Sequence, residues 1–318
     1  MSLYSIVSDP VSDVLSLVSM QAELVGFSCF SAPWGITFGS GYSYLHIMNS
    51  GTAWFRLDKI DELIRADAGD LLLFPKGSGH IMSDTPEREP VKLEAIVDKG
   101  FDKQSLQLRY GGSGAETHML CGRFRYTGMQ AEQLMNNLPS IIKISPSAST
   151  GLDWLETTQR YLMTEIRRQT PGFSAMTTSL LKLLFVQIIR EWANSHDQHL
   201  GWLSGVRDDR IGKALEAIHE NPSHSWTATK LAHIVNMSRS AFASRFVQTV
   251  GEAPLTYVRK WRLSLAADLL KTGRSTAGEV AYQIGYNSVG AFNRAFKAEF
   301  GTTPAAFKKS RKPCRSRT

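Results

Sequence analysis

SRSAFASRF, at residues 238–246, recurs fifty positions later as SVGAFNRAF, at residues 288–296. Upstream, Leu231-Ala232 corresponds to Val280-Ala281 at a spacing of forty-nine, so the second copy has a turn one residue longer. Other pairs that keep the spacing of fifty are Gly251 with Gly301, Pro254 with Pro304, and Tyr257 with Phe307. A repeat of this kind indicates that one small structural unit occurs twice.

Each copy is predicted to form a helix, a tight turn and a second helix. In the first copy, Thr227 can cap a helix that runs to about Ile234, and Ser238 can cap a helix that ends at Gly251. The second copy is expected to contain a helix over Glu279–Ile284, a turn at Gly285–Asn287, and a helix from Ser288 to Gly301. Apolar residues between the copies predict a long joining helix over Leu255–Lys271. The residues expected to anchor the second helices to their cores are Phe242, Phe246, Phe292 and Phe296.

A helix-turn-helix unit places the N-terminal half of its second helix in the major groove of DNA. On that helix, Arg294 is a candidate for bidentate pairing with guanine, and Asn293 for pairing with adenine. Ser238 and Ser288 can expose helix N-terminal amides to phosphates, although either serine can act simply as a cap. The predicted DNA-binding residues are Ser238, Arg239, Ser240, Ala243, Ser244 and Arg245 in the first copy, and Ser288, Gly290, Asn293, Arg294 and Lys297 in the second.

The charge distribution supports a polyanionic partner. Residues 201–318 contain 19 Lys and Arg against 8 Asp and Glu, a formal charge of +11, whereas residues 1–200 carry −4 of the total +7. Such asymmetry favours contact between the C-terminal part and nucleic acid.

From about Trp226 to Phe307 the chain resembles the DNA-binding domain of AraC/XylS-type transcription regulators. The residues that carry the resemblance include Leu231-Ala232, Met237 to Phe242, Gly251-Glu252-Ala253-Pro254, Arg262-Leu263, Ile284-Gly285-Tyr286, Arg294 to Lys297 and Pro304. The resemblance implies two recognition helices that enter successive major grooves, a homodimer, and RNA polymerase as a possible partner. Ala243 and Ser244 are smaller than the residues that family members often carry, so the first helix is expected to contribute mostly positioning.

Residues 30–125 resemble the cupin-type sensor domain that precedes this DNA-binding domain in a subset of these regulators. The resemblance rests on Ser31 to Gly35, Gly51 to Trp54, Gly69 to Pro75, Gly79-His80 and Cys121-Gly122. Strands are predicted over Tyr44–Met48, Ala53–Leu57 and Leu71–Phe74, separated by turn glycines. Several short strands with turn glycines suggest a β-barrel or a jelly roll. The expected fold class is therefore α+β, with an N-terminal cupin-like β-barrel, a helical connector and an all-α C-terminal domain.

The predicted domain boundaries are 1–130 for the sensor, 131–204 for a helical connector and dimerisation region, 205–310 for the DNA-binding domain, and 311–318 for a basic tail. Helices are expected over Trp154–Arg168 and Met176–Trp192, the second packing on the barrel or on a second subunit, and Asn194–Arg207 reads as a linker. A further helix is predicted over Asp209–Asn221.

The signal that the first domain senses is left open between a small organic effector, a metal and an oxidant. His46 and His80, with His118 and Cys121 as additions, are metal candidates, but the paired His-x-His of catalytic cupins is missing. Cys29 and Cys121 are candidate redox thiols, and two buried, inert thiols are the alternative. The cofactor is unknown, and the sequence assigns no metal ligand set.

The sequence favours a non-enzymatic function, because nucleophile and phosphate-loop motifs are missing and Pro222 interrupts the nearest resemblance to a zinc-protease motif. A cupin-type metal-dependent enzyme fused to a DNA-binding domain is the alternative. Three cysteines and the lack of a run of 18 apolar residues favour a cytoplasmic protein without a membrane partner.

Overall fold

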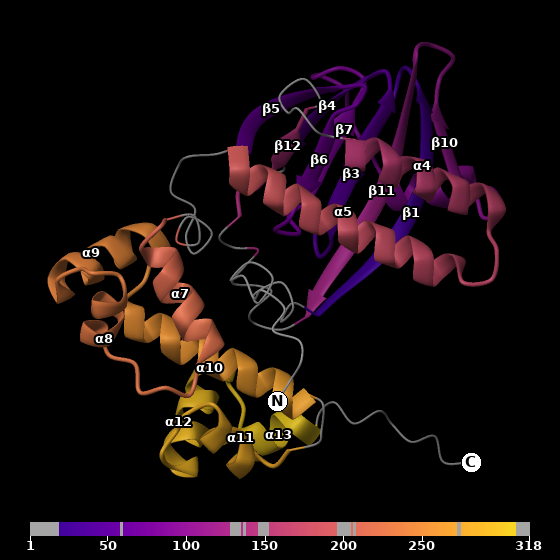
Figure 1. Ribbon diagram of the computed structural model, residues 1–318. Coiled ribbons are helices and arrows are strands. Elements are labelled where there is room, and N and C mark those ends of the chain that lie inside the picture. The colour runs from indigo at the N-terminus through magenta and orange to yellow at the C-terminus, as the bar shows by residue number, and fades with distance from the viewer. Residues whose placement is uncertain are drawn as a thin grey trace, which may run out of the picture. The chain divides into compact units, whose positions relative to one another are not determined.

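The computed structural model describes residues 19–57, 60–127, 135, 138–145, 153–195, 205, 208–271 and 275–309 (Figure 1). The chain forms two compact units, one of Met20–Thr127 with Leu134–His196, and the other mainly of Asp197–Thr318. The predicted basic tail at 311–318 and most of the predicted linker at 194–207 lie outside the described residues.

Two β-sheets form the N-terminal unit. The larger sheet has the strand order β12-β6-β3-β11-β1-β10-β9, and the smaller has the order β5-β4-β7-β2-β8. The larger sheet consists of β1 (Ser19–Ser31), β3 (Ser43–Ser50), β6 (Leu71–Phe74), β9 (Phe101–Asp102), β10 (Gln107–Gly111), β11 (Glu116–Thr127) and β12 (Ile142–Ile144). The smaller sheet consists of β2 (Gly35–Phe38), β4 (Thr52–Leu57), β5 (Ile60–Asp67), β7 (His80–Ser83) and β8 (Val91–Lys92). The predicted strands therefore form, and Gly51 takes the left-handed conformation expected at the turn between β3 and β4, with φ +79°.

The expected α+β fold class is confirmed, but the two sheets enclose one core without closing into a barrel in the described part of the chain. Helix α2 (Leu93–Gly100) follows β8 and contacts β2 and β8 of the smaller sheet as well as β9 and β10 of the larger one. Its Ile96 is buried in the core between the sheets. Helix α2 thus contacts the edge strands β8 and β9 of the two sheets, where direct strand pairing would otherwise join them.

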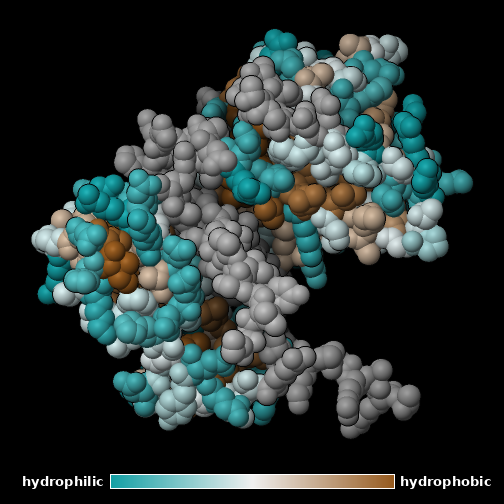
Figure 2. All heavy atoms as spheres, viewed as in Figure 1, coloured by the Kyte–Doolittle hydropathy of each residue, from teal (hydrophilic) through white to brown (hydrophobic). Residues whose placement is uncertain are grey.

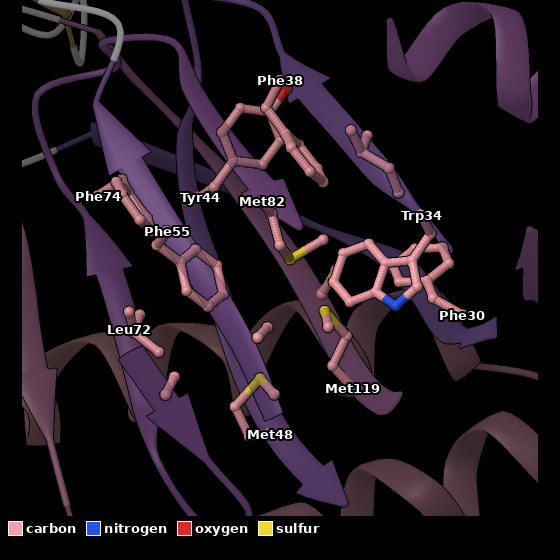
Figure 3. Close-up of a cluster of buried hydrophobic side chains, with 14 of the residues drawn as sticks. Phe30, Trp34, Phe38, Tyr44, Met48, Phe55, Leu72, Phe74, Met82 and Met119 are labelled. Atoms are coloured by element: carbon pink, nitrogen blue, oxygen red, sulfur yellow. The ribbon is translucent and has the colours of Figure 1, made fainter. Parts of the chain in front are cut away.

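Large apolar side chains fill the space between the sheets. Figure 3 shows Phe38, Tyr44, Phe55, Phe74 and Met82 projecting from strands of both sheets into one cluster. Phe55 is fully buried and Phe74 is 1% exposed, with ring centroids 5.9 Å apart. Alternation along each strand delivers these residues inward, as two packed sheets require.

Two helices, α4 (Asp153–Arg168) and α5 (Phe173–Ser195), lie against the larger sheet (Figure 1). Phe185 of α5 packs on Phe124 of β11 at a centroid distance of 5.5 Å, and a Cβ on Gly122 would meet Leu181 at 2.8 Å. Helix α5 was expected to pack on the sensor domain or on a second subunit, and the structure shows it packed on the larger sheet of the sensor domain. By length and composition alone, Phe173–Trp192 could cross a membrane, although the sequence has no unbroken run of 18 apolar residues. Because this helix packs on the sheet, its composition is only weak evidence for a membrane span.

The C-terminal unit is helical. Its helices are α7 (Ile211–Glu220), α8 (Ala228–Ile234), α9 (Arg239–Val250), α10 (Pro254–Lys271), α11 (Ala277–Gln283), α12 (Val289–Phe300) and α13 (Pro304–Lys309). Phe242, Phe246, Phe292 and Phe296 are all fully buried, so each second helix is anchored to its own core as predicted. The long helix α10 joins the two cores, since Val258 is buried in its first half and Leu270 in its second.

Candidate nucleic-acid interface and sensor interior

The first helix-turn-helix unit consists of α8, a turn and α9. Thr227 caps α8 by accepting a hydrogen bond from the backbone N–H of Lys230, and Ser238 caps α9 by accepting one from Ala241. Asn236 occupies the turn with φ +52°, a left-handed conformation that asparagine tolerates. Gly251 ends α9 with φ +88°. Both caps and the stop glycine were predicted from the sequence and are confirmed.

The second unit, α11 and α12, repeats this scaffold with stronger signals. Thr276 and Glu279 form a reciprocal capping box at α11, and Ser288 caps α12 through the N–H of Ala291. Helix α11 begins at Ala277, two residues before the predicted start at Glu279, because Thr276 supplies the cap. Gly285 takes the left-handed turn position with φ +84°.

The extra residue of the second turn is Asn287. The N–H of Met237 donates to Ala232 in the first unit, and the N–H of Tyr286 donates to Ala281 at the corresponding place in the second, both at 2.9 Å. Met237 is followed directly by the cap Ser238, whereas Asn287 separates Tyr286 from its cap. The predicted one-residue difference in turn length is confirmed.

The predicted recognition faces are largely exposed. Ser238, Arg239, Ser240 and Ser244 are exposed on the first unit, and Ala243 is partly buried. On the second unit, the exposed positions are Ser288, Gly290, Asn293, Arg294 and Lys297. Among the described residues no carboxylate forms an ion pair with Arg294 or Lys297, so both cations face solvent.

Arg245 differs from the other predicted contacts because it is paired within the protein. Its guanidinium approaches Asp208 with an N–O distance of 2.6 Å, and Asp208 also accepts hydrogen bonds from the N–H groups of Arg210 and Ile211 at the start of α7. The hydrogen bonds of this network hold the pKa of the Asp208 carboxyl below its usual value although burial alone would raise it. Arg245 thus ties α9 to α7, a role that the sequence did not reveal because Asp208 lies 37 residues away.

Arg262 of α10 connects the loop before the first unit to the turn of the second. Its guanidinium donates to the carbonyls of Pro222 at 2.6 Å, His224 at 2.7 Å and Gly285 at 3.4 Å. Ser223 lies close to Gly285, since a Cβ added to Gly285 would meet the carbonyl oxygen of Ser223 at 2.5 Å. These contacts of Arg262 were not predicted, although Arg262-Leu263 is part of the resemblance to the family's DNA-binding domain.

A second group of predicted residues meets in the interior of the N-terminal unit. His46 lies on β3 of the larger sheet and His80 on β7 of the smaller one, with their Nε2 atoms 2.9 Å apart. The Nδ1 atom of His46 lies 3.1 Å from Sγ of Cys121, its neighbour in the β3–β11 register. His46 and His80 are fully buried and Cys121 is 1% exposed, so these three candidates form one polar chain across an apolar core.

Burial keeps this chain uncharged. It lowers the pKa of His46 to about 3 and holds the pKa of His80 well below 6.5, with the neighbouring His46 adding to the shift at His80. Burial also raises the pKa of the Cys121 thiol to about 12, against a smaller opposing effect of Ser28. The imidazole of His80 stacks between Phe38 and Phe74, at centroid distances of 4.6 and 4.0 Å. Two neutral histidines and a protonated thiol therefore face one another at physiological pH.

The three side chains do not fit one metal ion in this arrangement. His80 and Cys121 contact opposite nitrogens of the His46 ring, so their donor atoms do not converge on one position, as a metal site requires. Nδ1 of His80 is buried and has no hydrogen-bond partner among the residues that the structure describes. The interior group is therefore a chain of neutral polar contacts that spans the two sheets.

Cys29 does not join the interior group. Ser28, its neighbour on β1, contacts Cys121 at 3.9 Å, and successive side chains on a strand point to opposite faces. Cys29 instead lies with Glu116 and His118 of β11. Both thiols are free, and burial followed by the charge of Glu116 raises the pKa of Cys29. The two candidate redox thiols thus face different sides of the larger sheet.

Comparison with known proteins identifies both parts of the chain. The family described as Cupin matches residues 9–194, and the family described as Helix-turn-helix domain matches residues 231–310. AlkR, an HTH-type transcriptional regulator of Acinetobacter baylyi, is 32% identical over 83% of this chain and 86% of its own length.

Other relatives match over almost the whole length. A putative AraC-like transcription regulator of Streptomyces lividans is 28% identical over 95% of this chain and 98% of its own length. The RCS-specific transcriptional activator RclR of Escherichia coli is 26% identical over 94% and 97%. These relatives are transcription regulators and not enzymes, which confirms the non-enzymatic prediction. The chain belongs to the AraC family of DNA-binding helix-turn-helix transcription regulators that carry an N-terminal cupin domain.

Proposed function

We propose that this AraC-type regulator reads a two-part DNA site with unequal halves, and that its cupin domain adjusts the reading in response to a signal. One observation carries the first part. Two equivalent helices, each capped by a serine, present different exposed side chains at matching positions. Because α9 and α12 share one backbone geometry but expose different side chains, we expect the two halves of the DNA site to be recognised differently.

The base contacts are assigned mainly to α12. Arg294 pairs with guanine through its bidentate guanidinium, and Asn293 pairs with adenine. Ser288 exposes backbone amides to a phosphate, and Lys297, one turn beyond Asn293, contacts the DNA backbone. A Cβ on Gly290 would meet only Arg294 among the described residues, at 3.7 Å, so the protein's own packing does not require a glycine there. We assign the missing side chain to a close approach of the helix to the base edges.

Positioning is assigned mainly to α9. Arg239 and the N-terminal amides behind Ser238 contact phosphates, and Ser240 and Ser244 add weak hydrogen bonds. Ala243 offers only a methyl group, which suits contact with thymine. Arg245 strengthens the positive field of this half, and the Asp208 carboxylate offsets part of that charge.

We assign the detection of the signal to the N-terminal unit. The three candidate signals are an organic effector, a metal ion and an oxidant. An organic effector would have to disturb the filled core around His46 and His80. A metal at these histidines would require their rings to turn. An oxidant would meet Cys29 before Cys121, since it reacts with thiolates and burial is deeper at Cys121.

We infer that the regulator is a homodimer in the cytoplasm, with RNA polymerase as a further partner. Figure 2 shows apolar side chains along α5, and Tyr161, Met176 and Leu183 of the two connector helices are 60%, 50% and 47% exposed. Exposed apolar residues on the outer side of a packed helix support pairing with a second copy. In sedimentation experiments, Leu183→Glu should shift the protein toward the monomer. Lys182→Glu, at the neighbouring exposed position, should not.

The experiment for the proposed function is recovery of genomic DNA fragments bound by the purified full-length protein, untreated, with oxidant, and with zinc. We expect a shared motif with two blocks about one helical turn apart. A change confined to the oxidant arm assigns the signal to the thiols, and a change confined to the zinc arm assigns it to a metal. Recovery no better than with scrambled DNA in all arms would contradict the proposal.

A further inference from the structure

We propose that Cys29, Glu116 and His118 form a zinc(II) site on the outer face of the larger sheet. Their ligand atoms all lie within 4.8 Å of one another, and Nε2 of His118 is 3.1 Å from Oε2 of Glu116. This group is separate from His46, His80 and Cys121, which project into the core. None of the three residues belongs to the predicted DNA-binding surface.

Strand geometry brings the three side chains together. Glu116 and His118 are two residues apart at the start of β11, so both project from the same face. Cys29 lies near the end of β1, the neighbouring strand, and projects away from the core that its neighbour Phe30 enters. A β-bulge between His118 and Met119 marks the inner end of the cluster, and such bulges often re-aim side chains beside functional sites.

The donor set suits zinc more than other common divalent ions. A thiolate, an imidazole and a carboxylate are all zinc ligands, whereas calcium and magnesium take oxygen donors. Thiolate and carboxylate together balance the charge of the ion. Tetrahedral zinc with bonds of about 2.0–2.3 Å spaces its ligand atoms about 3.3–3.8 Å apart, so binding requires only small side-chain movements. Three protein ligands leave the fourth position open for water.

The surroundings partly hold the ligands in place. The ring of Phe27 packs against His118 at a centroid distance of 5.8 Å, and Cys29 is 8% exposed while its neighbours on β11 remain accessible to solvent. Arg109 faces Cys29 in the β1–β10 register and adds positive charge there, which favours the thiolate and opposes the metal. The competing interpretation is a surface His–Glu ion pair beside an idle thiol.

The test is titration of the reduced, chelator-treated full-length protein with cobalt(II), a spectroscopic substitute for zinc. We expect one cobalt per chain, a thiolate-to-cobalt charge-transfer absorption, and displacement of cobalt by zinc. Cys29→Ser should abolish the charge-transfer band, whereas Cys314→Ser and Cys121→Ala should keep it. His118→Gln and Glu116→Gln should each weaken binding by roughly tenfold or more.

Zinc should also raise the melting temperature of the wild-type protein and leave that of Cys29→Ser unchanged, which provides a second measurement if one variant folds poorly. A band that persists in Cys29→Ser, or no saturable binding by the wild type, would overturn the site. The site does not depend on the proposed DNA reading, and DNA affinity measured on the same samples distinguishes the failure of one from the failure of the other.

Discussion

The two helix-turn-helix units share a scaffold and differ in what they expose. At matching positions, Arg239 and Ser240 of the first unit correspond to Val289 and Gly290 of the second. Further along the helix, the larger polar side chains belong to the second unit. Ala243, Ser244 and Val247 of the first unit correspond to Asn293, Arg294 and Lys297 of the second. Val247 is 45% exposed although apolar, whereas Lys297 offers a cation at the same place.

The comparison shows that two units with the same backbone fold can expose different side chains to DNA. The first helix carries Arg239 at its N-terminus, where phosphates contact helix amides, and Arg245 in its middle is paired with Asp208. The second helix carries an amide and a guanidinium in its middle, where side chains can reach base edges. We therefore expect the first unit to position the protein on DNA and the second to specify the sequence.

The largest expected effect tests whether the two cores are equivalent. Phe292→Ala and Phe242→Ala each remove a fully buried ring at matching positions and should each lower the free energy of unfolding by about 3–5 kcal/mol. Hydrogen exchange of the α9 and α12 amides in the full-length protein would report the local cost. A loss below about 1 kcal/mol in either unit would show that its core is less important than its burial indicates.

The turns provide a second contrast. Gly285→Ala combines a left-handed backbone with a contact of 2.5 Å to Ser223 and should cost about 1–3 kcal/mol of stability in urea unfolding. Asn236→Gly, at the matching left-handed turn position, should change stability by less than about 0.5 kcal/mol. If Gly285→Ala and Asn236→Gly both changed stability by only a small amount, the contacts of Arg262 and Ser223 would not fix the conformation of the second turn.

Specificity should depend on the second unit. Arg294→Ala should weaken binding to the target site by about 1–3 kcal/mol, with a smaller change on scrambled DNA. Ser244→Ala, at the matching position, should change target binding by less than about 0.5 kcal/mol. Fluorescence anisotropy at one fixed salt concentration measures both. Equal affinity for target and scrambled DNA before and after the Arg294 change would rule out the base contact.

The smallest effect concerns positioning by the first unit. Arg239→Ala should weaken binding to all sequences about equally and reduce the slope of log affinity against log salt by about 1. Val289→Ala, its counterpart, should leave the slope unchanged. A salt series from low to moderate concentration measures it, and an unaltered slope for Arg239→Ala would remove this residue from the phosphate contacts.

The helical part of this comparison could be predicted from the sequence because its signals are local. Ser238, Ser288, Gly251 and Gly301 fix helix ends through contacts within a few residues, and each was identified correctly. The fold class was also correct except for barrel closure, which depends on α2 bridging two sheet edges.

The contacts that escaped prediction join distant residues. Arg245 pairs with Asp208 and Arg262 reaches the turn at Gly285, at separations of 37 and 23 residues. The sequence nominated His46, His80 and Cys121, yet their arrangement depends on the strand register within each sheet and on the packing of the two sheets. It also grouped Cys29 with Cys121, whereas strand alternation turns Cys29 toward Glu116 and His118.

The most direct test is selection of binding sites from a random DNA library by the wild type and by Arg294→Ala. The account predicts a motif with one strongly and one weakly specified block about one helical turn apart, and loss of the strong block alone in the variant. Two blocks of equal strength, or a motif unchanged by the substitution, would contradict the assignment of specificity to the second unit.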